Sequence, residues 1–212
     1  MIKQIEGGVT AAKGFMAAGV EAGVKYKNRK DMAMVYSTMP CVAAGTFTSN
    51  VVKAAPILWD KKIVEESPYV QAVVVNSGIA NACTGKQGMD CCAAESRCAG
   101  ELLGIPEEAV LVASTGVIGM QMPVDRLQEG IRKLVQGKSD SLAAGLEAAQ
   151  AIMTTDTLPK QIAVEVAIGG RTVTLGGMCK GSGMIHPNMC TMLGFLTTDV
   201  CISKEMLQKA LR

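Results

Sequence analysis

The sequence predicts an α/β (α+β) fold in which helices pack on mixed β-sheets. Short β-branched runs alternate with longer segments whose apolar residues recur every three or four positions. A glycine pair also separates two runs of alternating polarity, as in a hairpin. The 212 residues can bury a substantial core. Aromatic residues make up 3%, and alanine, glycine and methionine replace large rings, which is typical of helices packed closely on sheets.

The first third of the chain is expected to hold strands and one short helix. Residues 7–24 have no clean period and are interpreted as loop with short extended pieces. Alternation or β-branching predicts strands at residues 31–37, 42–48 and 71–75. A short helix is expected to open at 49–54, before Pro56. The turn signal Asn76-Ser-Gly ends the last of these strands.

Helical periodicity dominates the middle of the chain. One helix is expected from about Gly88 to Leu103, ended by Gly104, and a second from Pro123 to about Gln136. Ser139 or Asp140 is expected to cap a third. The predicted apolar faces are Cys91, Ala94, Cys98 and Leu102 in the first helix, Leu127, Ile131, Leu134 and Val135 in the second, and Leu142, Leu146, Ala149 and Met153 in the third.

The remaining strands surround a glycine-rich segment. Val110–Ala113 is expected to be a buried strand that runs into Ser114-Thr-Gly. Residues 162–168 and 171–175 flank Gly169-Gly170 and predict a two-residue hairpin. A strand is expected over 194–203, and Ser203 is expected to cap a final short helix.

Composition excludes several classes of function. The net charge of +2 and the scarcity of aromatic platforms argue against nucleic-acid binding. No secretory signal and no apolar run of roughly 20 residues is present, so no membrane role is expected. The eight cysteines lack metal-ligand spacing, which predicts no metal and reduced thiols, mostly buried, in a cytoplasmic protein.

The segment from Lys180 to Gly194 concentrates unusual chemistry. It places three glycines and a Cys190–Thr191 pair between two apolar runs. A threonine becomes a good nucleophile when a base lies beside it, and its own α-amine serves once the preceding peptide bond is cut. The pattern suggests self-processing before Thr191, although most threonines at the start of a strand are structural.

The segment Lys180-Gly-Ser-Gly-Met-Ile-His-Pro-Asn-Met-Cys-Thr-Met-Leu resembles the cleavage site of the ornithine acetyltransferase (glutamate N-acetyltransferase) family. Four further segments match that family in order: Gly7-Gly-Val-Thr-Ala-Ala-Lys-Gly-Phe, Asn76-Ser-Gly-Ile-Ala-Asn-Ala-Cys-Thr-Gly, Ala113-Ser-Thr-Gly-Val-Ile-Gly and Met153-Thr-Thr-Asp-Thr. The chain departs from the family at Cys190, usually alanine, and at Ile79, usually asparagine.

The resemblance implies roles for individual residues. Thr191 would be the nucleophile, Thr115 and Gly116 the oxyanion hole, and Thr154, Lys180 and Thr191 the substrate contacts. Cleavage at Cys190–Thr191 would give an α chain of residues 1–190 and the start of a β chain at 191–212. On sequence alone, Ser114-Thr-Gly is more readily an ordinary strand-to-loop turn, and Lys180 is more readily a surface lysine.

The implied reaction is ping-pong transfer of acetyl from N-acetylornithine to glutamate, in arginine biosynthesis, through an acetyl-Thr191 intermediate. No cofactor is expected, although some members of the family accept acetyl-CoA as donor. The expected partners are N-acetylornithine, ornithine, glutamate and a β chain from the same precursor, in a higher-order hetero-oligomer. A related self-processing aminopeptidase or amidase, and a catalytically silent fragment, are the alternatives.

Overall fold

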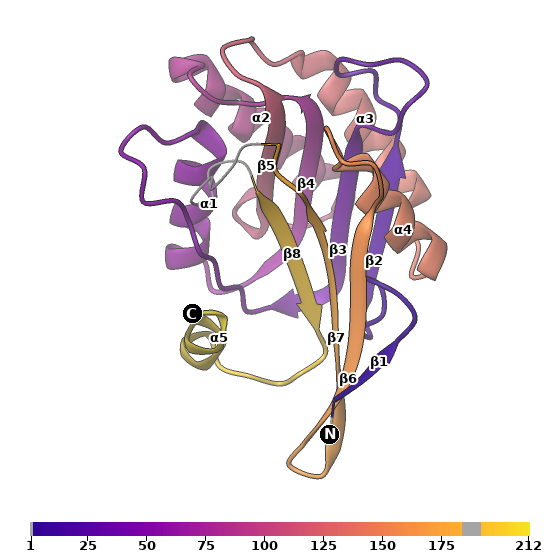
Figure 1. Cartoon of the computed structure of the whole chain (residues 1–212). Coiled ribbons are helices and arrows are strands. Elements are labelled where there is room, and N and C mark those ends of the chain that lie inside the picture. The colour runs from indigo at the N-terminus through magenta and orange to yellow at the C-terminus, as the bar shows by residue number, and fades with distance from the viewer. Residues whose placement is uncertain (1, 184–191) are drawn as a thin grey trace.

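The computed structural model describes residues 2–183 and 192–212, which form two four-stranded sheets and five α-helices (Figure 1). The strands are β1 Ile2–Ile5, β2 Phe15–Val20, β3 Met32–Cys41, β4 Val70–Ile79, β5 Val110–Val117, β6 Lys160–Ile168, β7 Arg171–Lys180 and β8 Leu193–Thr198. The helices are α1 Ala55–Glu66, α2 Gly85–Leu103, α3 Val124–Gly137, α4 Leu142–Ala151 and α5 Lys204–Leu211, with a 3-10 turn at Glu107–Ala109.

One sheet is mixed and the other is antiparallel. The first has the order β2-β3-β4-β5, and β5 runs parallel to β4 because α2 carries the chain back between them. The second has the order β1-β6-β7-β8, and each neighbouring pair is antiparallel. Helices packed on mixed sheets were predicted from the sequence, and this prediction is confirmed.

The two sheets face one another, and helices cover the outer face of the first (Figure 1). The core under α2 and α3 joins sheet residues such as Met34 and Val74 to Leu127 and Ile131. A second core, which includes Val75 and Met178, lies between the sheets and continues onto α4. The described chain thus forms a helix–sheet–sheet arrangement.

The outer face of the second sheet is apolar. Alternation along the strands turns Met178 and Phe195 inward and places their neighbours outward. The outward side chains include Ile2, Ile162, Ile168 and Leu196, which are 52–71% exposed. In Figure 1 this face is turned toward the viewer, and no helix of the described chain lies in front of it.

The predicted hairpin is confirmed. β6 and β7 pair from Ile168 and Arg171 outward, and Gly169 and Gly170 have φ of 57° and 76°. Both residues therefore occupy the left-handed region that such two-residue turns require. Two predicted helix ends are also confirmed. Gly104 ends α2 with φ of 69°, and Ser203 caps the start of α5, where its hydroxyl accepts from the Met206 amide.

The predicted strand at 42–48 and helix at 49–54 are wrong. Residues 42–50 have no regular structure, and the backbone of Gly45 pairs with the side-chain amide of Gln208 in place of a strand. The helix instead begins at Ala55, with Pro56 in its first turn. A proline is tolerated there because the first amides of a helix have no partner within it.

Two predicted turns are continuations of strands. β4 extends through Asn76-Ser-Gly to Ile79, and β5 extends through Ser114-Thr-Gly to Val117. These extensions pair with one another in register, with Gly78 opposite Gly116. The strand predicted at 194–203 also ends earlier, at Thr198.

Helix α4 differs from the prediction in its cap and its buried face. Ser141 caps it by accepting from the Ala144 amide, in place of Ser139 or Asp140. The buried residues are small, and Leu142 and Leu146 are 42% and 36% exposed. The helix lies so close to β2 that a Cβ on Gly19 would lie 2.2 Å from the Glu147 carbonyl oxygen, and the helix residues buried at this contact are small, such as Ala148 and Ala149.

The other helical predictions are close to the structure. Leu127, Ile131 and Leu134 are fully buried in α3, although Pro123 precedes the helix instead of opening it. α2 begins at Gly85, three residues earlier than predicted, and Leu102 is 43% exposed. Its buried face includes the polar side chains of Glu95 and Ser96 instead.

The cysteines of the described residues are free thiols. Cys91, Cys92 and Cys98 are buried, whereas Cys83 and Cys201 are exposed, so the prediction that most are buried is only partly right. No described helix is both long enough and apolar enough to cross a membrane. No group of described side chains is arranged to hold a metal ion.

Candidate active site

The ends of three strands gather at one end of the sheet pair. The C-terminal ends of β4, β5 and β7 lie together at the top of Figure 1. They carry three sequence motifs that were singled out above, Asn76-Ser-Gly, Ser114-Thr-Gly and Lys180-Gly-Ser-Gly. Thr191 and Cys190, the predicted nucleophile and cleavage site, lie outside the described residues.

Thr115 and Gly116 occupy the last pairs of the β4–β5 ladder. Thr115 is 8% exposed and lies opposite Ser77, and Gly116 lies opposite Gly78. Gly116 has φ of 141°, and a Cβ there would lie 2.2 Å from the carbonyl carbon of Gly78. Two backbones therefore approach at a distance that only glycine permits. This is the kind of position where backbone amides can leave the ladder and face a ligand.

Polar side chains of β4 and the loop after it hold this strand end in place. The side-chain amide of Asn76 donates to the Ile79 carbonyl at 2.8 Å, and the backbone amide of Asn81 donates to the Ser114 hydroxyl at 2.7 Å. Ser77 is fully buried, and its hydroxyl donates to the Ala151 carbonyl at 2.7 Å. This last bond ties the strand end to the end of α4, three residues before Thr154.

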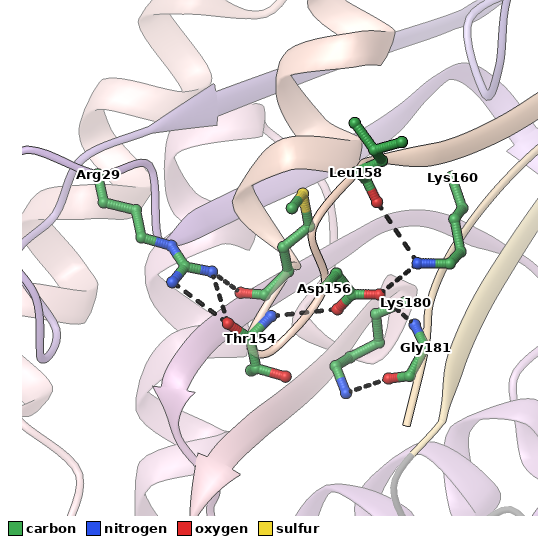
Figure 2. A network of polar contacts seen from close by, with 8 residues as sticks. Arg29, Thr154, Asp156, Leu158, Lys160, Lys180 and Gly181 are labelled. Atoms are coloured by element: carbon green, nitrogen blue, oxygen red, sulfur yellow. Dashed lines mark hydrogen bonds and ion pairs between the residues drawn. The ribbon is translucent and has the colours of Figure 1, made fainter. Parts of the chain in front are cut away.

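The turn after α4 is organised by Asp156. The side chain of Asp156 is 2% exposed, and its Oδ2 accepts from the Thr154 amide at 3.3 Å. Its Oδ1 accepts from Lys160 Nζ and from the Gly181 amide, both at 2.6 Å (Figure 2). Burial raises the pKa of this carboxyl, but the bonds from Lys160, Gly181 and Thr154 outweigh it and hold the pKa below its usual range.

Lys180 lies beside this turn at the end of β7. It is 3% exposed, and its Nζ donates to the Gly181 carbonyl at 2.7 Å (Figure 2). Burial lowers its pKa, Asp156 opposes that effect, and Lys160 adds to it. The interpretation of Lys180 as an ordinary surface lysine is therefore wrong. The structure brings Thr154 and Lys180 together through their shared neighbour Asp156.

Arg29 belongs to this cluster, although it lies in none of the sequence motifs. Its guanidinium donates to the carbonyls of Met153 and Thr154, with Nη2 at 3.3 Å from the latter (Figure 2). The same loop places Tyr26 with its ring 5.3 Å from the Arg29 guanidinium. A Cβ on Gly78 would meet Lys25 of this loop at 2.9 Å. The loop thus contacts both the β4 end and the Thr154 turn.

Asp31 anchors the loop that carries Arg29. It is fully buried, and its carboxylate accepts from the amides of Ala22 and Val24 at 2.7 and 2.6 Å. The backbone carbonyl of Asp31 also accepts from the backbone amide of Ser77 at 2.8 Å. A signal for such a role was present in the sequence, because an acid next to an apolar strand is unfavourable unless it is paired.

A second buried acid lies away from these strand ends. Glu95 on α2 is 3% exposed, and its Oε1 accepts from the Cys91 thiol at 3.3 Å, whereas its Oε2 has no protein partner. Burial raises its pKa to about 7, and the Cys91 bond offsets only part of that effect. Asp60 on α1 also has a raised pKa, because its carboxyl is buried and is affected by the negative charge of Glu95.

Two cavities outlined by described residues lie away from the strand ends. One of about 350 Å³ lies between α2 and the segment before α3, and is lined by Cys91, Ala94 and Met122 among others. Another of about 550 Å³ lies between α1, α5 and the loop containing Phe47. Neither contains a residue proposed here for chemistry. The candidate site is therefore defined by the strand ends.

Solved structures with little sequence similarity share this fold. The l-aminopeptidase d-ala-esterase/amidase of Ochrobactrum anthropi, described as a variant among the Ntn hydrolase fold, has a TM-score of 0.58 at 13% identity. The match covers 97% of this chain and 67% of that one. The two-sheet architecture thus places the chain in the same fold class as this variant.

Residues 16–212 match the ArgJ family, and the chain belongs to that family. The arginine biosynthesis bifunctional protein ArgJ of Symbiobacterium thermophilum is 53% identical over 210 residues, which is 98% of this chain and 52% of that protein. The protein of the same name from Thermotoga neapolitana is 48% identical over 94% of this chain and 50% of its own length. The chain therefore spans about half the length of these curated relatives.

Two solved structures are similar over nearly their whole chains. The ArgJ structure from Bacillus halodurans is 41% identical with a TM-score of 0.84, covering 91% of this chain and 98% of that one. The ornithine acetyltransferase from Mycobacterium tuberculosis, complexed with ornithine, is 40% identical with a TM-score of 0.82, covering 91% and 100%. The family predicted from the sequence motifs is confirmed.

Proposed function

We propose that this chain carries the first half of a self-cleaving acetyltransferase that moves acetyl from N-acetylornithine to glutamate in arginine biosynthesis. The observation that carries the proposal is the unbroken similarity to bifunctional ArgJ proteins over 98% of the chain. The solved ornithine acetyltransferase complexed with ornithine supports the choice of an ornithine-type substrate.

The proposed reaction has two acyl-transfer steps. The Thr191 hydroxyl attacks the acetyl carbonyl of N-acetylornithine, ornithine leaves with a proton, and an acetyl ester remains on the threonine. The amine of glutamate then attacks this ester and regenerates the hydroxyl. The α-amine of Thr191, free after cleavage, accepts and returns the proton.

The described residues fit the remaining roles. Each step passes through a tetrahedral oxyanion, which the Gly116 amide and the Thr115 hydroxyl would stabilise. The glycine-only approach of Gly116 to Gly78 supports this role, because it fixes the backbone at that strand end. The Lys180 ammonium would bind the substrate α-carboxylate, with Thr154 beside it.

The proposed precursor cuts itself between Cys190 and Thr191 into an α chain and a β chain. The chain lengths support this. The match with each of the two solved chains uses 91% of this chain and spans 98% or 100% of the solved chain. The curated relatives, in contrast, are about twice as long as this chain. The apolar outer face of the second sheet supports a β chain as partner, because an exposed sheet face of this kind marks an interface.

We infer further that the protein acts as a hetero-oligomer in the cytoplasm without a cofactor. The free thiols of the described cysteines agree with a reducing compartment. Acetyl-CoA is a second donor to be tested. The alternative function, a self-processing aminopeptidase or amidase, uses water as the acceptor in place of glutamate.

An acetyl-exchange assay tests the proposal. The protein is incubated with N-acetylornithine and labelled ornithine, without glutamate. A ping-pong transferase exchanges label into N-acetylornithine, and Thr191→Ala abolishes the exchange. Net release of acetate and ornithine without exchange would favour the amidase and contradict the transferase. Replacing N-acetylornithine by acetyl-CoA in the presence of glutamate tests the second donor.

A further inference from the structure

Asp156 connects two parts of the candidate site that lie far apart in the sequence. Its two carboxylate oxygens accept from the amides of Thr154 and Gly181, which are 27 positions apart. A carboxylate whose side chain is 2% exposed and which accepts bonds on both oxygens is a rigid connection. The turn after α4 is thereby fixed to the end of β7.

Arg29 fixes the same turn from the opposite side. Its guanidinium donates to the carbonyls of Met153 and Thr154, so the Thr154 peptide units are held at a carbonyl by Arg29 and at an amide by Asp156. The planar fork of arginine is suited to contact two neighbouring carbonyls together. Figure 2 shows Arg29 and Asp156 on either side of the turn.

The connection ends at Lys180. Gly181, whose amide is bound by Asp156, offers its carbonyl to Lys180 Nζ at 2.7 Å. A Cβ on Gly181 would lie 2.9 Å from Asp156 Oδ1, so the backbone approach is close. The ammonium thus binds the carbonyl of the same residue, Gly181, whose amide Asp156 holds.

We propose that Asp156 and Arg29 are positioning residues that hold Thr154 and Lys180 in the arrangement needed for acetyl transfer and for cleavage ten residues beyond Gly181. Neither residue takes part in the chemistry. The catalytic part of this inference rests on the proposed function, whereas the positioning of Lys180 is measurable without activity.

Asp156→Asn removes one acceptor and the negative charge with little change of shape, and the effect of charge loss alone is measured by the control variant below. Asparagine has the same shape, but its NH₂ group would face either the Thr154 amide or the Gly181 amide and Lys160, so one contact becomes donor against donor. Lys160→Met removes the ion pair and the 3.4 Å bond from Lys160 Nζ to the Leu158 carbonyl, and it leaves both backbone bonds to Asp156 in place. Arg29→Gln tests the opposite side of the turn.

Glu147→Gln is the matched control. It removes one negative charge and an ion pair of the same length, since Lys30 Nζ lies 2.6 Å from Glu147 Oε1. This pair is 34% and 47% exposed and lies outside the network. Far-UV circular dichroism and thermal melting establish that each variant is folded before it is compared.

The first readout is the acylation rate of Lys180 by N-hydroxysuccinimidyl acetate, followed by peptide mass spectrometry. The reagent acylates the neutral amine, and Asp156 and Lys160 both affect the pKa of Lys180. Each rate is therefore measured across pH and corrected for the Lys180 pKa of that variant, so that the corrected rate reports the accessibility of the side chain whether or not the protein is active. Asp156→Asn and Arg29→Gln are expected to raise the rate about fivefold, because each loses a buried hydrogen bond that opposes local opening. Lys160→Met and Glu147→Gln are expected to leave it within about twofold of wild type.

The second readout is the rate of cleavage at Cys190–Thr191 and of acetyl uptake. Asp156→Asn and Arg29→Gln are expected to slow both by about 10- to 100-fold, since small misplacements have effects of that size. Unchanged Lys180 acylation in both variants would overturn the proposal. So would changed acylation with unchanged cleavage and uptake. If wild type neither cleaves nor takes up acetyl, the proposed function fails, and the acylation rates alone decide whether the network positions Lys180.

Discussion

Glu95→Gln is expected to remove a pH dependence of stability that the buried acid creates. Burial raises the pKa of Glu95 from an ordinary value of 4.5 to about 7. The folded protein therefore binds this proton more tightly than the unfolded chain, and stability falls as pH rises. The effect begins near pH 4.5 and is complete slightly above pH 7.

The magnitude follows from the two pKa values. Each tenfold change in proton affinity is worth about 1.4 kcal/mol, so the ionised carboxylate lowers the free energy of unfolding by about 3 kcal/mol at pH 8. At pH 5 the same expression gives a loss of about 1 kcal/mol. Glutamine cannot ionise, and its side-chain oxygen can still accept from the Cys91 thiol. The advantage of the variant over wild type should therefore grow by about 2 kcal/mol between these pH values.

Urea unfolding followed by circular dichroism at pH 5, 6, 7 and 8 measures this difference. Because Glu95 also raises the pKa of Asp60, the same comparison is repeated in an Asp60→Asn background, where the pH dependence reports on Glu95. Glu101→Gln is the matched control, because Glu101 is an exposed acid on the same helix. A difference between Glu95→Gln and wild type that does not change with pH would refute the reasoning.

Three further substitutions test the candidate site. Gly116→Ala should lower the free energy of unfolding by at least about 1–3 kcal/mol, because φ of 141° and the contact with Gly78 both exclude a Cβ. Chemical denaturation measures the loss, and no loss would show that the two strand ends separate at little cost. Ser77→Ala leaves the buried Ala151 carbonyl without its donor and should cost about 1–3 kcal/mol by the same assay, with no loss contradicting a buried bond. Lys180→Met should raise KM for N-acetylornithine more than it lowers kcat, and a pure kcat effect in steady-state kinetics would exclude a role in binding the carboxylate.

Periodic apolar patterns predicted much of the fold. Local sequence specifies the features that depend only on nearby residues. These are the hairpin at Gly169-Gly170, the buried stripe of α3 and the cap at Ser203. α4 was misread because its buried face is set by distance to β2, which no local pattern records. Leucines that fit a helical stripe are exposed there, and alanines are buried.

The strand ends show the same limit at the candidate site. Asn76-Ser-Gly and Ser114-Thr-Gly each look like a turn when considered alone. Together they pair in register, because Gly78 and Gly116 allow two strands to continue side by side. A contact between residues 38 positions apart cannot be inferred from either segment separately.

The family motifs led to Thr115, Gly116, Thr154 and Lys180, but they did not identify what holds these residues. Asp156 lies within one matching segment and received no role, because its partners Thr154 and Gly181 become visible only in three dimensions. Arg29 lies in a loop without periodicity, and its partners are backbone carbonyls, which leave no trace in the sequence.

Intact mass spectrometry of the denatured protein, before and after incubation with N-acetylornithine, tests the central claim most directly. If Thr191 is the nucleophile, the protein gives one species that ends at Cys190 and a separate species that begins at Thr191. After incubation, the second species should gain the mass of one acetyl group, and Thr191→Ala should remain whole. A single uncut chain without added mass, both for this chain and for one extended to the length of its relatives, would contradict Thr191 as the nucleophile.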